Sequence, residues 1–263
     1  MAIFKIGVMS DCFRLGAFEG VRKAAELGAD GVQIWTTAGE MAPEAMDTGK
    51  RAEFKTFVAD SGLELASLCG DIGAYSDPAE NEDRVARQKL ILDLAADLGT
   101  AVVTSHIGVV PDEPNDEVYR TLHAALSEIG SHAVERGVTF AIETGPERGS
   151  VLKTLLDDVG SPGVAVNLDP ANLVMVAGDD PVDAVQALGE YIVHTHAKDG
   201  VMTPGKGHAF EELPLGQGGV KWDAYLAALE ASGFSGYLTI EREVGDDPGN
   251  DIAMAIEFLR SQL

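Results

Sequence analysis

The chain has 263 residues, with 43 acidic against 19 basic side chains and a formal net charge of −24. A surface of that sign repels polyanions, so nucleic acid is excluded as a partner. No apolar run reaches the roughly 20 residues that cross a bilayer, and we expect no membrane association. The two cysteines, Cys12 and Cys69, suggest neither a disulfide framework nor a zinc–thiolate site, and the first residues lack a signal-peptide pattern. We therefore expect a cytoplasmic protein.

In chain order, helix-like segments that end at a glycine alternate with short apolar runs. The glycines that precede such runs are Gly28, Gly62, Gly99, Gly137 and Gly233. Glycine adopts the left-handed conformation that ends many helices, and the apolar runs are typical of buried strands. Repeated helix–glycine–strand units predict parallel strands joined by helical crossovers, which is the α/β class.

The apolar runs predict about eight strands, the number in a TIM barrel. They are expected near residues 3–9, 31–35, 63–68, 101–105, 138–142, 164–168, 191–196 and 236–241. Eight strands alternating with helices favour a single (β/α)8 TIM barrel, which takes about 250 residues, and we expect residues 1–263 to form one catalytic domain. A doubly wound open sheet would need a glycine-rich phosphate turn after its first strand, and Ser10–Gly16 lacks that pattern.

Helix starts and buried helix faces are also visible in the sequence. Asp77 precedes Pro78 and Glu80, an arrangement that predicts a capped helix start. Apolar residues at helical spacing predict two faces that pack in the core. These residues are Trp222, Tyr225, Leu226 and Leu229 in one helix, and Ile252, Ala255, Ile256 and Leu259 in the other.

Four consecutive strands end in side chains that carry acid–base or metal-binding chemistry. The fifth, sixth and eighth strands run into Glu143, Asp169 and Glu241, and the seventh contains His194 and His196. Side chains alternate along a strand, so both histidines point the same way. The same alternation places bulky apolar residues toward the helices and the polar residues inside the barrel. We therefore expect the candidates at the carboxyl-end mouth, where such barrels hold their chemistry.

Two glutamates, one aspartate and one histidine form an oxygen-rich ligand set. Such a set suits Mn²⁺, Mg²⁺ or Co²⁺ better than a structural zinc, and Mn²⁺ is the ion we expect. A bound ion polarises a carbonyl and stabilises an enediolate, while Glu143 and Glu241 flank the substrate carbon as acid and base. In the alternative interpretation, each acid caps a loop or pairs with Lys198 or Arg242. Four strand ends with matching alternation favour the metal site.

Five motifs carry a resemblance to a known family. They are Ile142–Gly145, Asn167–Asn172, His194–Asp199, Pro214–Trp222 and Thr239–Glu241. With them, the chain resembles over nearly its whole length the xylose-isomerase-like barrel family of sugar phosphate isomerases and epimerases, which includes the ketose 3-epimerases. The resemblance implies that Glu143, Asp169, His196 and Glu241 are metal ligands. It also implies that Glu143 and Glu241 move a proton off and onto the carbon beside the carbonyl, from opposite faces.

The sequence departs from the family's epimerases at two places that grip the sugar. Asn172 stands where they often carry a histidine, and it is our candidate substrate contact there. They often place an arginine shortly after the histidine–aspartate motif of strand seven, and Gly200–His208 contains none. Lys206 and His208 lie in this Gly-rich segment, which is a candidate cover for the site.

Further residues near the mouth are candidates for contacting the substrate. His106, after the fourth strand, contacts the substrate or caps a loop. Lys198 holds a substrate oxygen or forms an ion pair with Asp199 or Glu241. His194 either belongs with the substrate contacts or packs beneath the metal. Trp35 is a platform for a sugar or a core residue.

These features predict a metal-dependent isomerase or epimerase that acts on a ketose or keto-sugar. A lyase or dehydratase acting on an oxidised sugar or inositol would use the same proton abstraction and then expel a leaving group. Phosphodiester hydrolysis at abasic DNA would need more metal ligands and a basic face, and a non-catalytic sugar-binding barrel would not need two opposed carboxylates. The expected partner is a small carbohydrate. The family resemblance also implies a homo-oligomer, a dimer or a tetramer.

Overall fold

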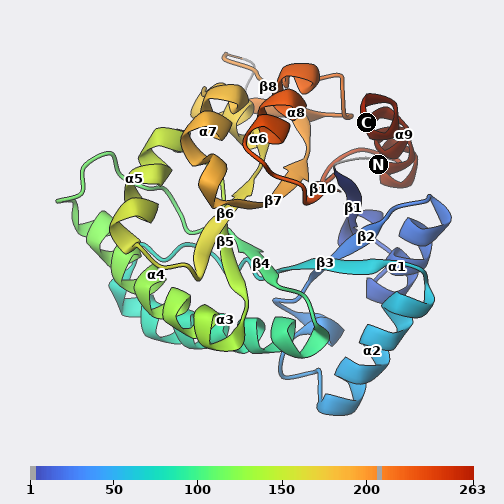
Figure 1. Ribbon diagram of the computed structural model, residues 1–263, viewed down its shortest axis with the longest axis horizontal. Helices are drawn as coiled ribbons and strands as arrows, with labels where there is room; N and C mark the ends of the chain where they lie inside the picture. Colours follow the sequence, from blue (N-terminus) through green and yellow to red (C-terminus); the bar gives the residue numbers. More distant parts are fainter. Residues whose placement is uncertain (1–3, 206–208) are drawn as a thin grey trace.

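The computed structural model describes residues 4–205 and 209–263. Within these ranges, eight parallel strands close into a barrel in the order β1-β2-β3-β4-β5-β6-β7-β10, with helices around it (Figure 1). The barrel strands are β1 (Lys5–Met9), β2 (Gly31–Trp35), β3 (Glu64–Cys69), β4 (Val102–Ser105), β5 (Thr139–Glu143), β6 (Val164–Leu168), β7 (Ile192–Ala197) and β10 (Tyr237–Ile240). All eight predicted strands are confirmed, although residue 3 of the first lies outside the described part. The fold is the predicted α/β TIM barrel.

Helices connect the strands on the outside of the barrel. They are α1 (Ala17–Glu26), α2 (Thr48–Asp60), α3 (Pro78–Leu98), α4 (Glu117–Arg136), α5 (Gly149–Val159), α6 (Pro170–Asn172), α7 (Pro181–Leu188), α8 (Trp222–Ala231) and α9 (Pro248–Gln262). Turns of 3-10 helix are η1 (Ser10–Phe13), η2 (Gly39–Met41) and η4 (Gly189–Tyr191), and η3 (Leu173–Ala177) is a π-helical turn. No described helix combines the length and the apolar character that crossing a bilayer requires.

The local signals in the sequence act as predicted. The five glycines before the strands all have positive φ, between 67° at Gly137 and 87° at Gly99. The Asp77 carboxylate accepts a hydrogen bond from the backbone N–H of Ala79 at 2.9 Å and so caps α3. Both predicted apolar faces, on α8 and α9, are buried. Helix ends and core faces therefore depend on residues close to them in sequence.

Polar side chains fill the barrel interior between the apolar strand faces. Asn167 and Thr239 both contact His194 there, which confirms the predicted alternation on β6, β7 and β10. Gly7 makes room for this layer on β1, because a Cβ at that position would lie 2.5 Å from Oγ1 of Thr239. The barrel is thus closed around a polar layer that leads to its mouth.

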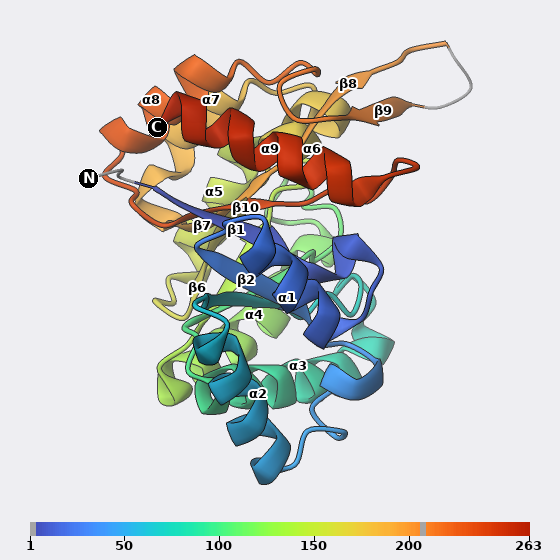
Figure 2. The same ribbon diagram turned by 90° about the vertical axis from the view of Figure 1, so that its right-hand side faces the viewer.

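An antiparallel hairpin, unforeseen from the sequence, follows β7. Its strands are β8 (Asp199–Met202) and β9 (Phe210–Leu213), and Figure 2 shows it projecting beyond the barrel. The Asp199 carboxylate fixes its base by accepting hydrogen bonds from Nε1 of Trp222 and from the backbone N–H of Gly216 at 3.0 Å each. Lys206 and His208, considered above as a cover for the site, lie outside the described residues.

Candidate active site

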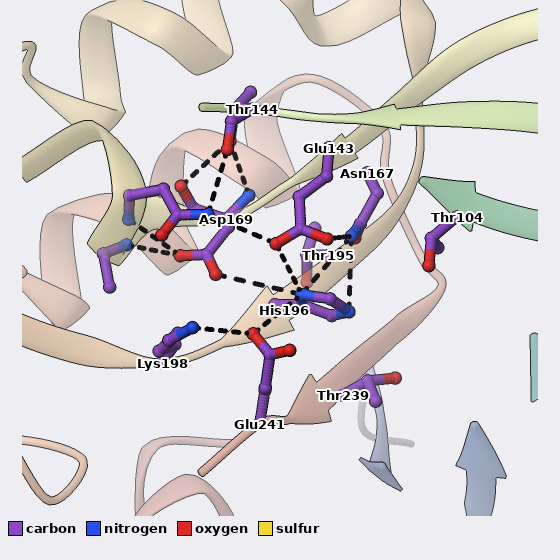
Figure 3. Close-up of polar contacts among 12 residues, drawn as sticks. Thr104, Glu143, Thr144, Asn167, Asp169, Thr195, His196, Lys198, Thr239 and Glu241 are labelled. Atoms are coloured by element: carbon purple, nitrogen blue, oxygen red, sulfur yellow. Dashed lines mark hydrogen bonds and ion pairs between the residues drawn. The ribbon is translucent and has the colours of Figure 1, made fainter. Parts of the chain in front are cut away.

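Four side chains from neighbouring strands meet at the carboxyl-end mouth of the barrel. Glu143 ends β5, Asp169 follows β6, His196 lies in β7 and Glu241 follows β10. Each offers one ligand atom, and these four atoms all lie within 4.8 Å of one another (Figure 3). Ligand atoms about 2.1 Å from one divalent ion are separated by about 3 to 4.2 Å, so small side-chain adjustments suffice to share an ion. All four residues are buried.

The three carboxylates surround one ring nitrogen of the histidine. Nδ1 of His196 lies 3.2 Å from Oε1 of Glu143, 3.3 Å from Oε2 of Glu241 and 3.8 Å from Oδ2 of Asp169. Burial alone would lower the pKa of His196, but the negative charges of Glu143 and Glu241 raise it well above its ordinary value. The arrangement therefore attracts positive charge to the centre of the four groups.

Asp169 divides its two carboxylate oxygens between a structural contact and the centre of the site. Oδ1 caps α6 by accepting hydrogen bonds from the backbone N–H groups of Ala171 and Asn172 at 2.7 and 3.0 Å. Oδ2 is buried and finds no hydrogen-bond partner among the described residues. A buried carboxylate oxygen without a donor is costly, and a cation at this position would relieve the cost.

Gln33, on β2 across the barrel, determines how His196 is presented. Its Oε1 accepts a hydrogen bond from Nε2 of His196 at 2.9 Å, while its own Nε2 donates to Oγ1 of Thr104 at 2.7 Å. The contact at Nε2 leaves Nδ1 of the histidine directed at the carboxylates. Partners of this kind fix the tautomer and the ring orientation of metal-binding histidines.

His194 lies one layer below His196 in the barrel. Its Nδ1 donates to Oδ1 of Asn167 at 2.9 Å, and Nε2 accepts from the hydroxyls of Ser67 at 3.1 Å and Thr239 at 2.9 Å. Burial lowers the pKa of His194 well below its ordinary value, so the ring is neutral. Both ring nitrogens are engaged and the side chain is 1% exposed, which places it beneath the ligand cluster and away from the mouth.

Comparison with known proteins agrees with the barrel fold. A sequence profile of the xylose isomerase-like TIM barrel family matches residues 21–262. The chain belongs to this family. Among curated relatives, a protein of Escherichia coli O157:H7 named L-ribulose-5-phosphate 3-epimerase UlaE is 25% identical over 281 residues, with 97% of each chain covered.

Two solved structures superpose closely on this xylose isomerase-like barrel. A xylose isomerase domain protein from Planctomyces limnophilus has a TM-score of 0.86 at 28% identity and covers 98% of this chain and 97% of its own. The D-psicose 3-epimerase of Clostridium cellulolyticum H10, solved with D-tagatose, has a TM-score of 0.79 at 17% identity, with 99% of both chains covered. At 17% identity, the similarity to the D-psicose 3-epimerase shows a shared fold only.

Two of the predicted substrate contacts in this xylose isomerase-like barrel lie against Glu143. His106 is half-exposed, with Nδ1 2.8 Å from Oδ2 of Asp71 and Nε2 3.6 Å from Oε1 of Glu143. The charge of Glu143, followed by Asp71, raises the pKa of His106 to about 10, so the ring is a cation at the mouth. Asn172 donates from Nδ2 to Oε1 of Glu143 at 3.2 Å and to the backbone oxygen of Thr144 at 3.1 Å.

The two remaining candidates are Lys198, which follows β7, and Trp35, which ends β2. Nζ of Lys198 lies 3.0 Å from Oε2 of Glu241 and 2.5 Å from Oε2 of Glu243. The predicted pairing with Glu241 is present, whereas the Asp199 carboxylate is used by the hairpin base instead. Trp35, at the end of β2, is partly buried and donates from Nε1 to Oγ1 of Thr37.

The alternative interpretation of the acids, as caps or ion-pair partners, describes part of what the structure contains. Asp169 does cap a helix, and Glu241 does pair with Lys198. Arg242, however, turns away from the cluster, because Nε and Nη1 each lie 2.8 Å from carboxylate oxygens of Asp251 and Glu212. None of these contacts supplies a hydrogen bond to Oδ2 of Asp169.

Sequence reasoning missed several polar residues around the site. Gln33 is the clearest case, and its signal was a polar residue in the apolar run 31–35. Asp71 and Glu212 stand in loop-like sequence that carries no comparable signal. Glu147 is also buried, burial raises its pKa, and its Oε2 has no hydrogen-bond partner in the described part of the chain.

Proposed function

We propose that this protein is a divalent-metal-dependent epimerase or isomerase that acts on a ketose or keto-sugar. The proposal rests above all on Oδ2 of Asp169, which is buried, has no hydrogen-bond partner among the described residues, and lies 3.8 Å from Nδ1 of His196, beside Glu143 and Glu241. A site of three buried carboxylates is costly to fold without compensating positive charge, of which Lys198 and His196 supply a part. A divalent ion held by these residues would supply that charge.

The donor set fits hard cations. Three carboxylates and one imidazole suit Mn²⁺, our first choice, and also Mg²⁺ or Co²⁺. When bound, the ion supplies a Lewis acid that makes the hydrogen on the carbon next to a carbonyl easier to remove. Gln33 keeps His196 oriented for this purpose, and the cap made by Oδ1 of Asp169 holds Oδ2 in place.

Glu143 and Glu241 are the proposed acid–base pair. They come from β5 and from the end of β10, and both reach Nδ1 of His196 from different directions. One takes a proton from the substrate carbon to give an enediolate, and the other returns a proton to the opposite face. The name of the Escherichia coli relative, a 3-epimerase of a pentulose phosphate, supports this reaction class.

His106 and Trp35 are the proposed substrate contacts on the rim. The half-exposed ring of His106 offers a polar nitrogen to a sugar oxygen beside Glu143, and the partly buried Trp35 offers an aromatic edge. We assign His194 no substrate contact, because both of its ring nitrogens are engaged within the barrel. Asn172 and Lys198 affect the substrate indirectly, because they orient the carboxylates of Glu143 and Glu241, respectively.

Hydrogen exchange in heavy water tests the proposal. Protein loaded with Mn²⁺ is incubated with a panel of ketoses, ketose phosphates and 3-keto sugars, and NMR follows deuterium at the carbon next to the carbonyl. Exchange that depends on the metal and produces the epimer or isomer is the expected result. Exchange with loss of water or of another leaving group would assign the lyase or dehydratase reaction instead. Absence of exchange across the panel at saturating metal would overturn both.

Three further expectations accompany this proposal. We place the protein in the cytoplasm, treat residues 1–263 as one catalytic domain, and expect a dimer or a tetramer. Fractionation of cells, limited proteolysis and light scattering, respectively, measure these properties.

A further inference from the structure

Lys198 holds the same carboxylate oxygen that faces the proposed metal position. Oε2 of Glu241 lies 3.3 Å from Nδ1 of His196 and 3.0 Å from Nζ of Lys198 (Figure 3). The lysine side chain is 6% exposed, so water screens its charge weakly. A divalent ion bound to this oxygen would stand close to the ammonium group. Two cations on one carboxylate oxygen repel each other, and the lysine therefore competes with the ion.

A second set of carboxylates is ready to receive the lysine. Nζ already contacts Oε2 of Glu243 at 2.5 Å, and Oε2 of Glu212 lies 3.9 Å away. Lysine is a compact point charge on a flexible four-carbon chain, so a shift of about 1 Å would complete the contact with Glu212. If Nζ of Lys198 moves away from Glu241, the ammonium group therefore still has carboxylate partners.

Glu212 is fixed in a position from which its carboxylate can accept the ammonium group of Lys198. It lies in β9, and its side chain is 5% exposed. Oε1 accepts hydrogen bonds from Nη1 of Arg242 at 2.8 Å and from the backbone N–H of Glu243 at 3.2 Å. These contacts fix the carboxylate and leave Oε2 as the oxygen nearest to Lys198.

We propose that Lys198 and the divalent ion compete for Glu241, and that Glu212 of the β8–β9 hairpin is the positioning residue that draws the ammonium group away when the ion binds. This inference rests on the metal site of the proposed function. It makes the base of the hairpin part of the metal equilibrium, because ion binding strengthens the Lys198–Glu212 contact and that contact favours ion binding in return.

Calorimetric titration with Mn²⁺ measures the competition directly. Lys198→Met removes the competing charge and should tighten Mn²⁺ binding about tenfold, within the usual range of such couplings. Glu212→Gln keeps an acceptor for Arg242 but attracts the ammonium group less, and should weaken Mn²⁺ binding about fivefold. Glu211→Gln, the exposed neighbour on the same strand, is the matched control and should change the affinity little.

The double variant separates a positioning role from a merely structural one. If Glu212 acts through Lys198, then Glu212→Gln should lose most of its effect on Mn²⁺ affinity in the Lys198→Met background. An unchanged effect in that background, or equal affinities for all variants, would overturn the inference. Failure of the wild-type protein to bind Mn²⁺ or Mg²⁺ would instead overturn the proposed metal site itself.

A crystal structure of the wild-type protein with Mn²⁺ provides a measurement that needs no variant. Nζ of Lys198 should move off Oε2 of Glu241 and come within hydrogen-bond distance of Oε2 of Glu212. Retention of the 3.0 Å contact with Glu241 beside a bound ion would contradict the competition.

Discussion

Carboxylates lie at both ends of the barrel, but their burial and their partners differ. At the amino ends of the strands, here called the floor, Glu64 lies 2.7 Å from Nζ of Lys5 and accepts from the hydroxyl of Tyr237 at 2.8 Å. Asp30 pairs there with Arg260 at 2.8 Å. At the mouth, the four groups of the candidate site are buried, and Oδ2 of Asp169 has no hydrogen-bond partner among the described residues.

We interpret the carboxylates of the floor as stabilising the fold and those of the mouth as serving function. Glu64 is exposed and Asp30 is half-buried, and each has a cation of its own, so their contacts need no further ligand. The mouth concentrates three carboxylates in a buried space, where Lys198 and His196 offset part of their charge and a bound divalent cation would offset more. Natural proteins keep such arrangements at sites that bind or react. The contrast makes the two ends suitable controls for each other.

The largest expected difference between the two ends is in turnover. Glu143→Gln and Glu241→Gln should each reduce kcat at least about 1,000-fold, because each removes a proton-transfer group and a metal ligand. Glu64→Gln on the floor should leave kcat unchanged. Steady-state rates with the substrate found by deuterium exchange measure both. Full activity in either mouth variant would remove the acid–base assignment.

Next in size is the stabilisation that the ion confers. Mn²⁺ at about 100 times its dissociation constant should stabilise the wild-type protein by about 2.7 kcal/mol, which raises Tm by about 5 to 10 °C and is reversed by a chelator. Asp169→Asn retains a capping oxygen for α6 but loses the charged ligand, so the shift should vanish. The matched control is Asp180→Asn at the cap of α7, which should keep the full shift.

Gln33 extends the comparison to a neutral residue. Gln33→Met removes the hydrogen bond to Nε2 of His196 and should weaken Mn²⁺ binding about 10- to 100-fold, the usual cost of losing such a partner. Titration calorimetry measures the affinity. Gln186→Met, on the exposed face of α7, is the control and should behave like the wild-type protein. Equal affinities for the two variants would show that the orientation of His196 does not depend on Gln33.

The smallest effect is expected at the floor. The hydrogen bond from Lys5, followed by that from Tyr237, lowers the pKa of Glu64 below its ordinary value. Glu64 therefore contributes stability above its unfolded pKa of about 4.3 and loses that contribution as the pH falls toward the folded value. Glu64→Gln should lower the free energy of unfolding by less than about 1 kcal/mol at pH 7, since the pair is exposed. Urea denaturation at pH 7 and pH 4 should show the difference shrinking in acid.

The sequence by itself determined the strands, the helix ends and the set of residues at the mouth. Strand alternation, helix-ending glycines and capping residues act over a few positions, so they can be recognised locally. Parallel strands bring their carboxyl ends to one rim, and this is why Glu143, Asp169, His196 and Glu241 could be expected together before any coordinates.

Only the tertiary structure decided which atoms face one another. Gln33 reaches His196 across 163 positions of sequence, and the hairpin that carries Glu212 arises in a segment that reads as a Gly-rich loop. Asp169 has one capping oxygen and one oxygen that accepts no hydrogen bond from the described residues, and this division likewise depends on how α6 meets the mouth. These contacts follow from packing around the whole closed barrel, because their partners come from distant segments that carry no local signal for each other.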